Sequence, residues 1–314
     1  MTNTVWYPHA IYLPGGVSIT QLSDVVPAHN YQDLTEFAAS EPAPMFTGTH
    51  QASPDNRFSS TQIKTLLDQF IAGEYNVAKD YLSGTVQVEF KAGKLAGVRE
   101  GNAEEAHIRA NCEENTGLFW ESFRVRQGGL VEMRCRLVSV LNPETEADPM
   151  VFTAAVTLNA TAAVNALFTL GKQVINGTDL SGVEEIEWNN NLTYEERSSD
   201  GDEFLTYIGV RNCAPVCRIV TTDLTVMETF TERGTALQTY NCFLRKKLKS
   251  KINVADTTAE HIRLQATAGT VKAREINGSP ATAVVEVAMA APSAGSPPFS
   301  VNSAIAIVEP PSND

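Results

Sequence analysis

Two histidines stand in similar stretches of the sequence and are the first residues that could do chemistry. His107 begins His-Ile-Arg in EAHIRANCEENTG, and His261 begins His-Ile-Arg in AEHIRLQATAG. A histidine can act as a general acid or base near neutral pH, so a catalytic role is one interpretation. Because both residues occupy the same place in similar stretches, we favour the other interpretation, in which each is hydrogen-bonded at the start of a strand and does the same structural job.

A second candidate is an acidic cluster in SSDGDEF, formed by Asp200, Asp202 and Glu203. The Asp-x-Asp spacing could begin a calcium site. The remaining loop ligands and the bidentate glutamate of an EF-hand are missing, so the pattern favours a solvated acidic turn.

A third candidate is a group of glutamates that could supply the paired carboxylates of a glycosidase. They are Glu185, Glu187, Glu195 and Glu196. They alternate with Ile186, Trp188, Leu192 and Tyr194 along EEIEWNNNLTYEE. This period of two predicts one strand with a buried face and a wet face, and the glutamates then belong to the wet face.

Four basic residues of CFLRKKLKSK share one face of a predicted strand. Like charges on one face are costly unless something negative lies opposite. Either this face is solvated, or it meets the acidic face of a neighbouring subunit; nucleic acid is a weaker third option. The candidate residues for such a subunit interface are Arg245, Lys247, Lys249, Lys251, Glu185, Glu187 and Glu195.

Sequence motifs of enzymes and cofactor sites are absent from the chain: there is no nucleophile elbow, P-loop, dinucleotide fingerprint or HExxH. The five cysteines form no CxxC pair and leave one residue unpaired, which favours a reducing compartment. Cys135 alternates with apolar residues and is expected to be a buried hydrophobe. We therefore predict no enzyme activity, no cofactor and no metal.

The composition restricts the partners. The 314 residues carry a net charge of -13, which opposes loose binding to nucleic acid or to an anionic membrane. The N-terminal residues have no signal-peptide pattern. Residues 151–170 lack charge, but their threonines and β-branched alternation predict paired strands rather than a membrane span.

Similar residues recur at a nearly constant offset along the chain, so the elements that position the candidate residues are predicted to occur twice. Several residue pairs differ by 161 (for example 177 minus 16), the histidines differ by 154, Gly117 and Gly269 by 152, and Pro149 falls near Pro298. The common order of these features predicts two copies, residues 1–160 and 161–314. The pairs that differ by 161 are Gly16 and Gly177, Asn30 and Asn191, Gly48 and Gly209, Pro54 and Pro215, and Arg57 and Arg218.

Each copy is predicted to be rich in strands with one helix. SSTQIKTLLDQFI has one apolar face at helical spacing, with Ser59 and Gln62 as a capping box. TTDLTVMETF is its weaker counterpart, Asp200-Gly201 and Asn277-Gly278 predict turns, and ATAVVEVAMA and FSVNSAIAIV supply the last strands. The predicted fold class is mainly β, with two tandem β-sandwich or β-barrel domains, each packed by one helix.

The order of these segments resembles a tail tube domain of tailed bacteriophages. The resemblance is carried by GVEEIEWNNNLTYEE, SDGDEFLTYIGV, TTDLTVMETF, HIRLQATAGTVKAREI and FSVNSAIAI, and it covers most of both halves. It is a likeness of pattern, since no single residue is diagnostic.

The resemblance implies a virion structural protein of the tail, assembled in the host cytoplasm, whose rings stack into a DNA conduit. Two tandem domains imply a ring of three subunits with pseudo-sixfold symmetry, other tail proteins as partners and no membrane. The acidic composition agrees with a negative lumen that repels DNA phosphates over about 8 Å. The alternatives are another virion component, such as a capsid decoration or baseplate protein, and a sugar-binding module or enzyme that uses Trp6, Trp120 or Trp188.

Overall fold

The computed structural model describes most of the chain. It covers residues 4–28, 32–36, 46–51, 54–71, 73–94, 99–112, 115–142, 144–145, 147–164, 166–198, 203–248, 250 and 252–307. The fold is mainly antiparallel β with two short helices among these residues, and neither helix is long and apolar enough to cross a membrane.

The first half of the chain contains twelve strands and one helix in the described residues. They are β1 (Thr4–Leu13), β2 (Val17–Ile19), β3 (Leu22–Ala28), β4 (Gln32–Glu36), β5 (Phe46–Gln51), β6 (Asp55–Ser60), α1 (Ile63–Phe70), β7 (Ala78–Leu82), β8 (Val86–Lys94), β9 (His107–Cys112), β10 (Thr116–Arg126), β11 (Glu132–Ser139) and β12 (Met150–Val156).

The second half contains the same number of each in the described residues. They are β13 (Leu167–Ile175), β14 (Thr178–Asp179), β15 (Val183–Asn189), β16 (Thr193–Arg197), β17 (Tyr207–Asn212), β18 (Val216–Thr221), α2 (Val226–Thr229), β19 (Thr235–Ala236), β20 (Tyr240–Lys247), β21 (His261–Ala266), β22 (Gly269–Asn277), β23 (Thr282–Met289) and β24 (Ser300–Ile305).

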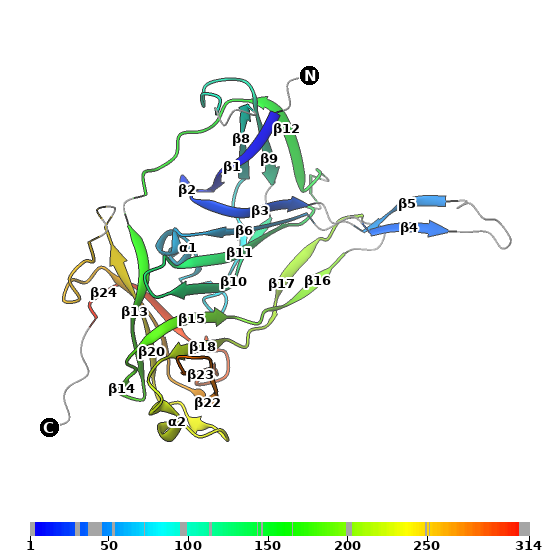
Figure 1. The fold of residues 1–314 in the computed structure, drawn as a ribbon. Helices are drawn as coiled ribbons and strands as arrows, with labels where there is room; N and C mark the ends of the chain where they lie inside the picture. The colour runs from blue at the N-terminus through cyan, green and yellow to red at the C-terminus, as the bar shows by residue number, and fades with distance from the viewer. Residues whose placement is uncertain are drawn as a thin grey trace.

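One ten-stranded sheet runs through the molecule, and a five-stranded sheet belongs to each half (Figure 1). The large sheet has the order β19-β22-β23-β18-β15-β10-β11-β6-β3, and β7 also pairs with β10. The main apolar cluster has members from both halves, and two smaller apolar clusters lie apart from it.

The strand order in the two halves follows one scheme. The five-stranded sheets have the orders β12-β9-β8-β1-β2 and β24-β21-β20-β13-β14, so adding twelve to each label converts the first into the second. The same addition converts β7-β10-β11-β6-β3 into β19-β22-β23-β18-β15 within the large sheet.

The two histidines make the same hydrogen bonds. Nδ1 of His107 accepts from the Ala92 amide at 3.0 Å, and its Nε2 lies 2.8 Å from the Gly101 carbonyl oxygen. Nδ1 of His261 accepts from the Lys246 amide at 2.9 Å, and its Nε2 lies 3.0 Å from the Ala255 carbonyl oxygen, again six residues before the histidine. Both rings are fully buried at the first residue of a strand, so the predicted hydrogen-bonded position is confirmed.

Two prolines matched in the sequence also lie in equivalent places. The Ser139 amide donates to the Pro54 carbonyl at 3.0 Å, and the Met289 amide donates to the Pro215 carbonyl at 2.9 Å. Gly16 and Gly177 likewise both lie in the turn after the first strand of their half, with φ of +79° and +82°, a conformation that glycine adopts without strain.

The predicted match of Gly117 with Gly269 is wrong by one residue. Ser139 faces Thr116 across the ladder, whereas Met289 faces Gly269. Gly269 therefore takes the place of Thr116, because the segments before the two strands differ in length by one residue.

Helix α1 buries the predicted apolar face, but its predicted cap is absent. Ile63, Leu66, Leu67 and Phe70 are buried, in agreement with the helical spacing. Ser59 belongs to strand β6, and no side chain caps the helix, so the capping box is wrong. The counterpart α2 is a single turn of four residues, since its sequence is poor in helix formers.

Two strand predictions need correction. The stretch 185–195 is two strands, β15 and β16, which belong to different sheets because Asn191 turns the chain with a positive φ. Residues 151–170 do contain strand residues at both ends, but β12 pairs with β9 and β13 pairs with β20, so these strands are not paired with each other. The turn at Asn277-Gly278 and the last two strands are confirmed, whereas Asp200-Gly201 lies outside the described residues.

Candidate assembly interface

The two halves of the chain meet where β10 pairs with β15. Phe123 faces Trp188 and Val125 faces Ile186 in this antiparallel ladder. At its two ends the Gln127 amide donates to the Glu184 carbonyl at 2.7 Å, and the Asn190 amide donates to the Glu121 carbonyl at 2.9 Å. Since main-chain groups alternate sides along a strand, the Phe123 amide also points toward β15.

Aromatic rings from both halves stack beneath this junction. Ring centroids are 5.7 Å apart for Phe123 and Trp188, 6.1 Å for Trp120 and Trp188, and 5.1 Å for Trp188 and Phe299. Trp120 and Trp188 are fully buried, so neither can form an exposed platform for a sugar; Trp6 is the one of the three tryptophans that is partly exposed. Stacked and edge-to-face rings of this kind stabilise the join beyond the area they bury.

Glu185, predicted at a subunit interface, pairs across the junction inside one chain. It accepts hydrogen bonds from Arg124 and from Arg126, the latter at 3.0 Å. Burial alone would raise the pKa of Glu185, but the two arginines outweigh it and the pKa lies below the usual value of 4.5. Glu187 is exposed on the same strand, and Glu195 on β16 pairs with Arg197.

One residue of the predicted basic face, Arg245, is paired within its own half. Arg245 donates to both carboxylate oxygens of Asp256, at 2.8 and 2.7 Å. Arg245 and Lys247 line a polar cavity of about 570 Å³, in which Lys172 pairs with Asp179 at 2.8 Å. The structure does not bring these basic residues to the predicted glutamates, and Lys249 and Lys251 lie outside the described residues.

The large sheet ends in two strands that have one partner each over most of their length. At one end β3 pairs with β6. At the other end β22 pairs with β23 and, through Thr270 and Val271, with the short β19. In the described part of the chain the outer side of β22 beyond Val271 faces no further strand.

Strand β10 corresponds to β22 in the strand order, but other strands pair with it along both of its sides. Its outer side is covered first by β7, over Thr116–Phe119, and then by β15, over Ser122–Arg126. β22 has the counterpart of β7, namely β19, but no counterpart of β15. Strand β3 stands in the place of β15 and, within the described residues, has no counterpart of β10.

The exposure of apolar side chains follows this difference. Both β10 and β22 have a ladder irregularity, between Trp120 and Ser122 and between Ala273 and Glu275, which sets Ile276 in the place of Phe123. Phe123 is 1% exposed and Ile276 is 52% exposed. At the other open edge Val26 of β3 is 59% exposed. Unpaired edges with exposed apolar residues invite pairing with another strand.

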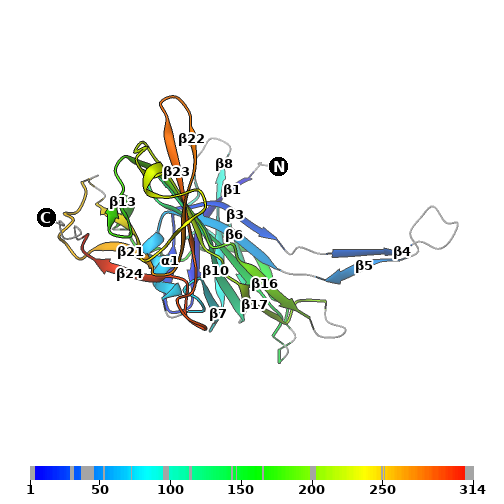
Figure 2. The same cartoon turned by 90° about the horizontal axis from the view of Figure 1, so that it is seen from below.

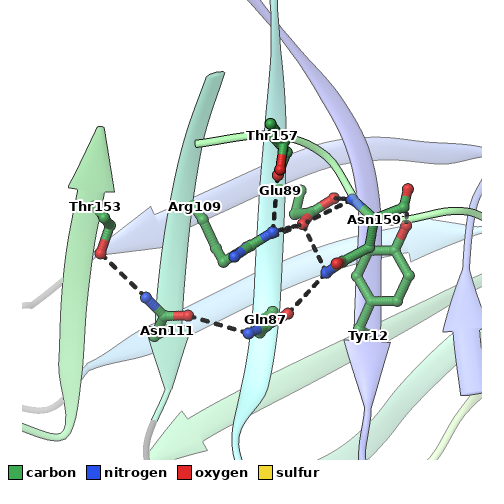
Figure 3. A network of polar contacts seen from close by, with 8 residues as sticks. All are labelled: Tyr12, Gln87, Glu89, Arg109, Asn111, Thr153, Thr157 and Asn159. Carbon is green, nitrogen blue, oxygen red and sulfur yellow. Dashed lines mark hydrogen bonds and ion pairs between the residues drawn. The ribbon is translucent and has the colours of Figure 1, made fainter. Parts of the chain in front are cut away.

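A buried carboxylate, Glu89, lies at the centre of a polar network that was not predicted from the sequence (Figure 3). It accepts from Arg109 at 2.6 and 2.9 Å and from the amide and side chain of Asn159, the latter at 2.9 Å. The Tyr12 hydroxyl donates to the Asn159 carbonyl, and burial and the charge of Glu89 raise the pKa of Tyr12 to about 12. These bonds hold the segment that follows β12 across the sheet. The sequence carries no clear signal for them, because Gln87 and Glu89 alternate with apolar residues in VQVEF as on any solvated strand face.

The described residues were searched for clustered metal ligands. They contain no group of three or more histidine, cysteine, aspartate or glutamate residues that could hold a metal. Asp200 and Asp202 lie outside the described residues, and Glu203 is described without them. Cys135 is buried as predicted, and burial holds the pKa of its thiol well above the usual value.

Comparison with known proteins gives no relative: no family model and no curated protein sequence matches the chain. The open edges of the large sheet are the structural feature that supports a functional proposal.

Proposed function

We propose that this chain is a structural protein of the tail-tube type, which joins copies of itself head to tail into a closed ring. The observation that carries the proposal is the internal junction of β10 with β15. Strands β22 and β3 are the equivalents of that pair and are left open at opposite ends of the same sheet. Pairing β22 of one copy with β3 of the next would repeat the junction between chains.

The proposal includes a tandem duplication, with copies at residues 1–160 and 161–314. The shared strand order, the identical bonds of His107 and His261, and the equivalent proline contacts support it. A head-to-tail contact between different surfaces forms a ring when the rotation closes. With two domains per chain and six domains in a tube ring, three copies close the ring with pseudo-sixfold symmetry.

In such a ring the face of the large sheet turned away from the five-stranded sheets would point to the channel wherever the hairpin β16–β17 does not cover it. This face interleaves both signs of charge rather than carrying one sign. Arg134 lies 3.5 Å from Glu121, and Arg274 pairs with Glu286 at 2.5 Å. We propose that DNA passes through a lumen that the acidic composition keeps negative, and that the paired charges of this face offer phosphates few free cations.

The proposed setting is the virion tail, after assembly in the host cytoplasm, with other tail proteins at the ends of the tube. The protein would act without catalysis, cofactor or membrane, and genomic DNA would pass without specific binding. The acidic net charge of -13 agrees with this lack of specific binding.

Electron microscopy of the purified protein at rising concentration tests the proposal. We expect stacked hollow rings of three chains with pseudo-sixfold density. Particles that remain single chains at high concentration, or rings in which the large sheets do not meet, would overturn it.

A further inference from the structure

Trp6 in β1 and Phe168 in β13 are equivalent residues of the two halves. Trp6 faces Ala92 across its ladder, and Phe168 faces Lys246. The amides of Ala92 and Lys246 are the groups that donate to the two equivalent histidines, so these ladder partners are equivalent as well. The two aromatic residues therefore occupy the same position in the two five-stranded sheets.

The two aromatic residues differ in burial. Phe168 is 1% exposed and belongs to the main apolar cluster, whereas Trp6 is 40% exposed. The first half of the chain covers Phe168: the Val131 amide donates to the Phe168 carbonyl at 2.8 Å, and the buried Val131 side chain belongs to the same cluster. Leu130 faces Thr169 in an antiparallel bridge, so Val131 lies directly opposite Phe168. This contact is part of the internal junction between the halves.

Trp6 has no such cover from the described residues. Strand β2 pairs with β1 only at residues 11–13, whereas residues 4–8 of β1 pair with β8 on the other side. The side of β1 next to Trp6 is therefore an open edge in the described part of the chain, as is the outer side of β22.

Ala281 is the residue of the second half that is equivalent to Val131. Strands β11 and β23 begin at equivalent residues, because each begins seven residues before the amide that binds the equivalent proline carbonyl (139 minus 132 and 289 minus 282). Val131 directly precedes β11, and Ala281 directly precedes β23. Ala281 is exposed in a turn that projects from the molecule (Figure 2). In Figure 1 the hairpin of β22 and β23 lies at the bottom and β1 at the top, so Ala281 does not reach Trp6 of the same chain.

We propose that the turn between β22 and β23 of one copy covers Trp6 of the neighbouring copy, with the Ala281 amide donating to the Trp6 carbonyl. This proposal rests on the proposed ring, in which the same β22 pairs with the neighbour's β3. The internal junction, where the equivalent residues bury each other, identifies the occupant as a second copy of this chain.

The sizes of the side chains agree with this contact. A tryptophan stands in the place of Phe168, and an alanine stands in the place of Val131. The larger ring and the smaller partner offset each other, and cores tolerate best the changes that keep the total volume.

Intrinsic fluorescence tests whether assembly covers Trp6. The other two tryptophans, Trp120 and Trp188, are fully buried in the single chain, so Trp6 is the one whose contact with water assembly would change. We expect the emission of the original protein to move to shorter wavelength as rings form at rising concentration. Trp6→Phe should form rings without this shift. Rings of the original protein that form with no shift would overturn the proposal.

A cysteine pair in the full-length protein tests which segment covers Trp6. Opposite residues of an antiparallel ladder have Cβ atoms about 4.5–5.5 Å apart, near the separation that a disulfide needs. In Trp6→Cys with Ala281→Cys, oxidation should link neighbouring copies, and a non-reducing gel should show covalent dimers and trimers. The matched control is Phe168→Cys with Val131→Cys, which should form its disulfide within one chain. Each single Trp6→Cys or Ala281→Cys variant should give no such ladder.

The outcomes separate this inference from the proposed function. Rings in the microscope without interchain disulfides overturn the contact between Trp6 and Ala281, whatever the emission does, and leave the ring intact. Single chains without rings overturn both.

An exchange of side-chain sizes gives a further test without cysteine. Ala281→Val should crowd Trp6 and raise the protein concentration needed for assembly about fivefold or more, and Trp6→Phe in the same chain should restore it. Val5→Ala, on the other face of β1, is the control and should leave this concentration unchanged. A double variant that assembles no better than Ala281→Val alone would contradict the contact.

Discussion

The junction of β10 with β15 and the open edge of β22 are equivalent places in the two halves, yet one is buried and the other is not. Phe123 lies under the neighbouring strand, while Ile276 in the same ladder position is half exposed. The strands have the same neighbours on their inner side, so the difference comes only from what covers their outer side. This difference in exposure between equivalent residues is the observation on which the proposed contact between chains rests.

A second pair of equivalent positions is buried in both halves, but one position holds a charged residue and the other an apolar residue. Glu89 faces Arg109 in the first half, and Phe243 faces Arg263 in the second. Glu89 collects the polar network of Figure 3, whereas Phe243 packs with Val174 and Ile307 in an apolar cluster. The arginine is present in both halves, but Nε of Arg263 is buried without a hydrogen-bond partner.

Substitution of the two arginines is expected to give the largest difference in unfolding free energy between the two five-stranded sheets. Arg109→Leu leaves the buried Glu89 without its cation and should cost about 3 kcal/mol of unfolding free energy. Arg263→Leu removes no ion pair and should change stability by about 0–1 kcal/mol. Urea unfolding below the assembly concentration measures both.

The control for the first change is Glu89→Leu together with Arg109→Leu, which removes both charges and should recover much of the loss. Equal losses for Arg109→Leu and Arg263→Leu would show that the Glu89 pair does not distinguish the two sheets.

The two histidines are expected to behave alike. His107→Phe and His261→Phe each remove two hydrogen bonds between a buried ring and the main chain, so each should lower the unfolding free energy by about 1–3 kcal/mol. Thermal unfolding of the two variants checks this. A loss for one histidine and none for the other would break the equivalence of the halves.

A smaller effect is expected from acid at the internal junction. The pKa of Glu185 is lowered in the folded chain, so the unfolded chain binds the proton more readily and Glu185 stabilises the fold above about pH 4.5. This contribution is lost as the pH falls through the lowered pKa. Because the arginines are half exposed, Glu185→Gln should cost less than about 1 kcal/mol at pH 7.

Urea unfolding at pH 7 and at about pH 3 measures this difference. The variant should differ from the original chain at pH 7 and match it in acid, while Glu187→Gln, on the exposed part of the same strand, serves as the control. A difference that grows in acid would contradict the assigned sign.

Local patterns in the sequence predicted much of the fold. Period-two alternation located β15 and β23, and helical spacing located the buried face of α1. The paired histidines were correctly expected to be hydrogen-bonded at strand starts, because the same residues recur at a fixed offset.

The remaining features depend on contacts between distant segments. The break at Asn191 separates β15 from β16, and Ser60 rather than Ser59 binds the Gln62 amide at the start of α1. Alternation of glutamates could not show that Glu185 is held by arginines some sixty residues earlier. The open edges could not be predicted either, because the residue pattern of a strand does not show whether another strand pairs with it.

The measurement that tests the account most directly is the mass of the assembled particle for the original chain and for Ile276→Pro. By the register of β10, the Ile276 amide points to the open edge, so proline there removes an edge donor and leaves the pairing of β22 with β23 in place. Native mass spectrometry should give particles of three chains for the original protein and for Ile276→Val, and folded single chains for Ile276→Pro. Rings of unchanged mass from Ile276→Pro, or an original chain that never leaves the monomer, would contradict the account.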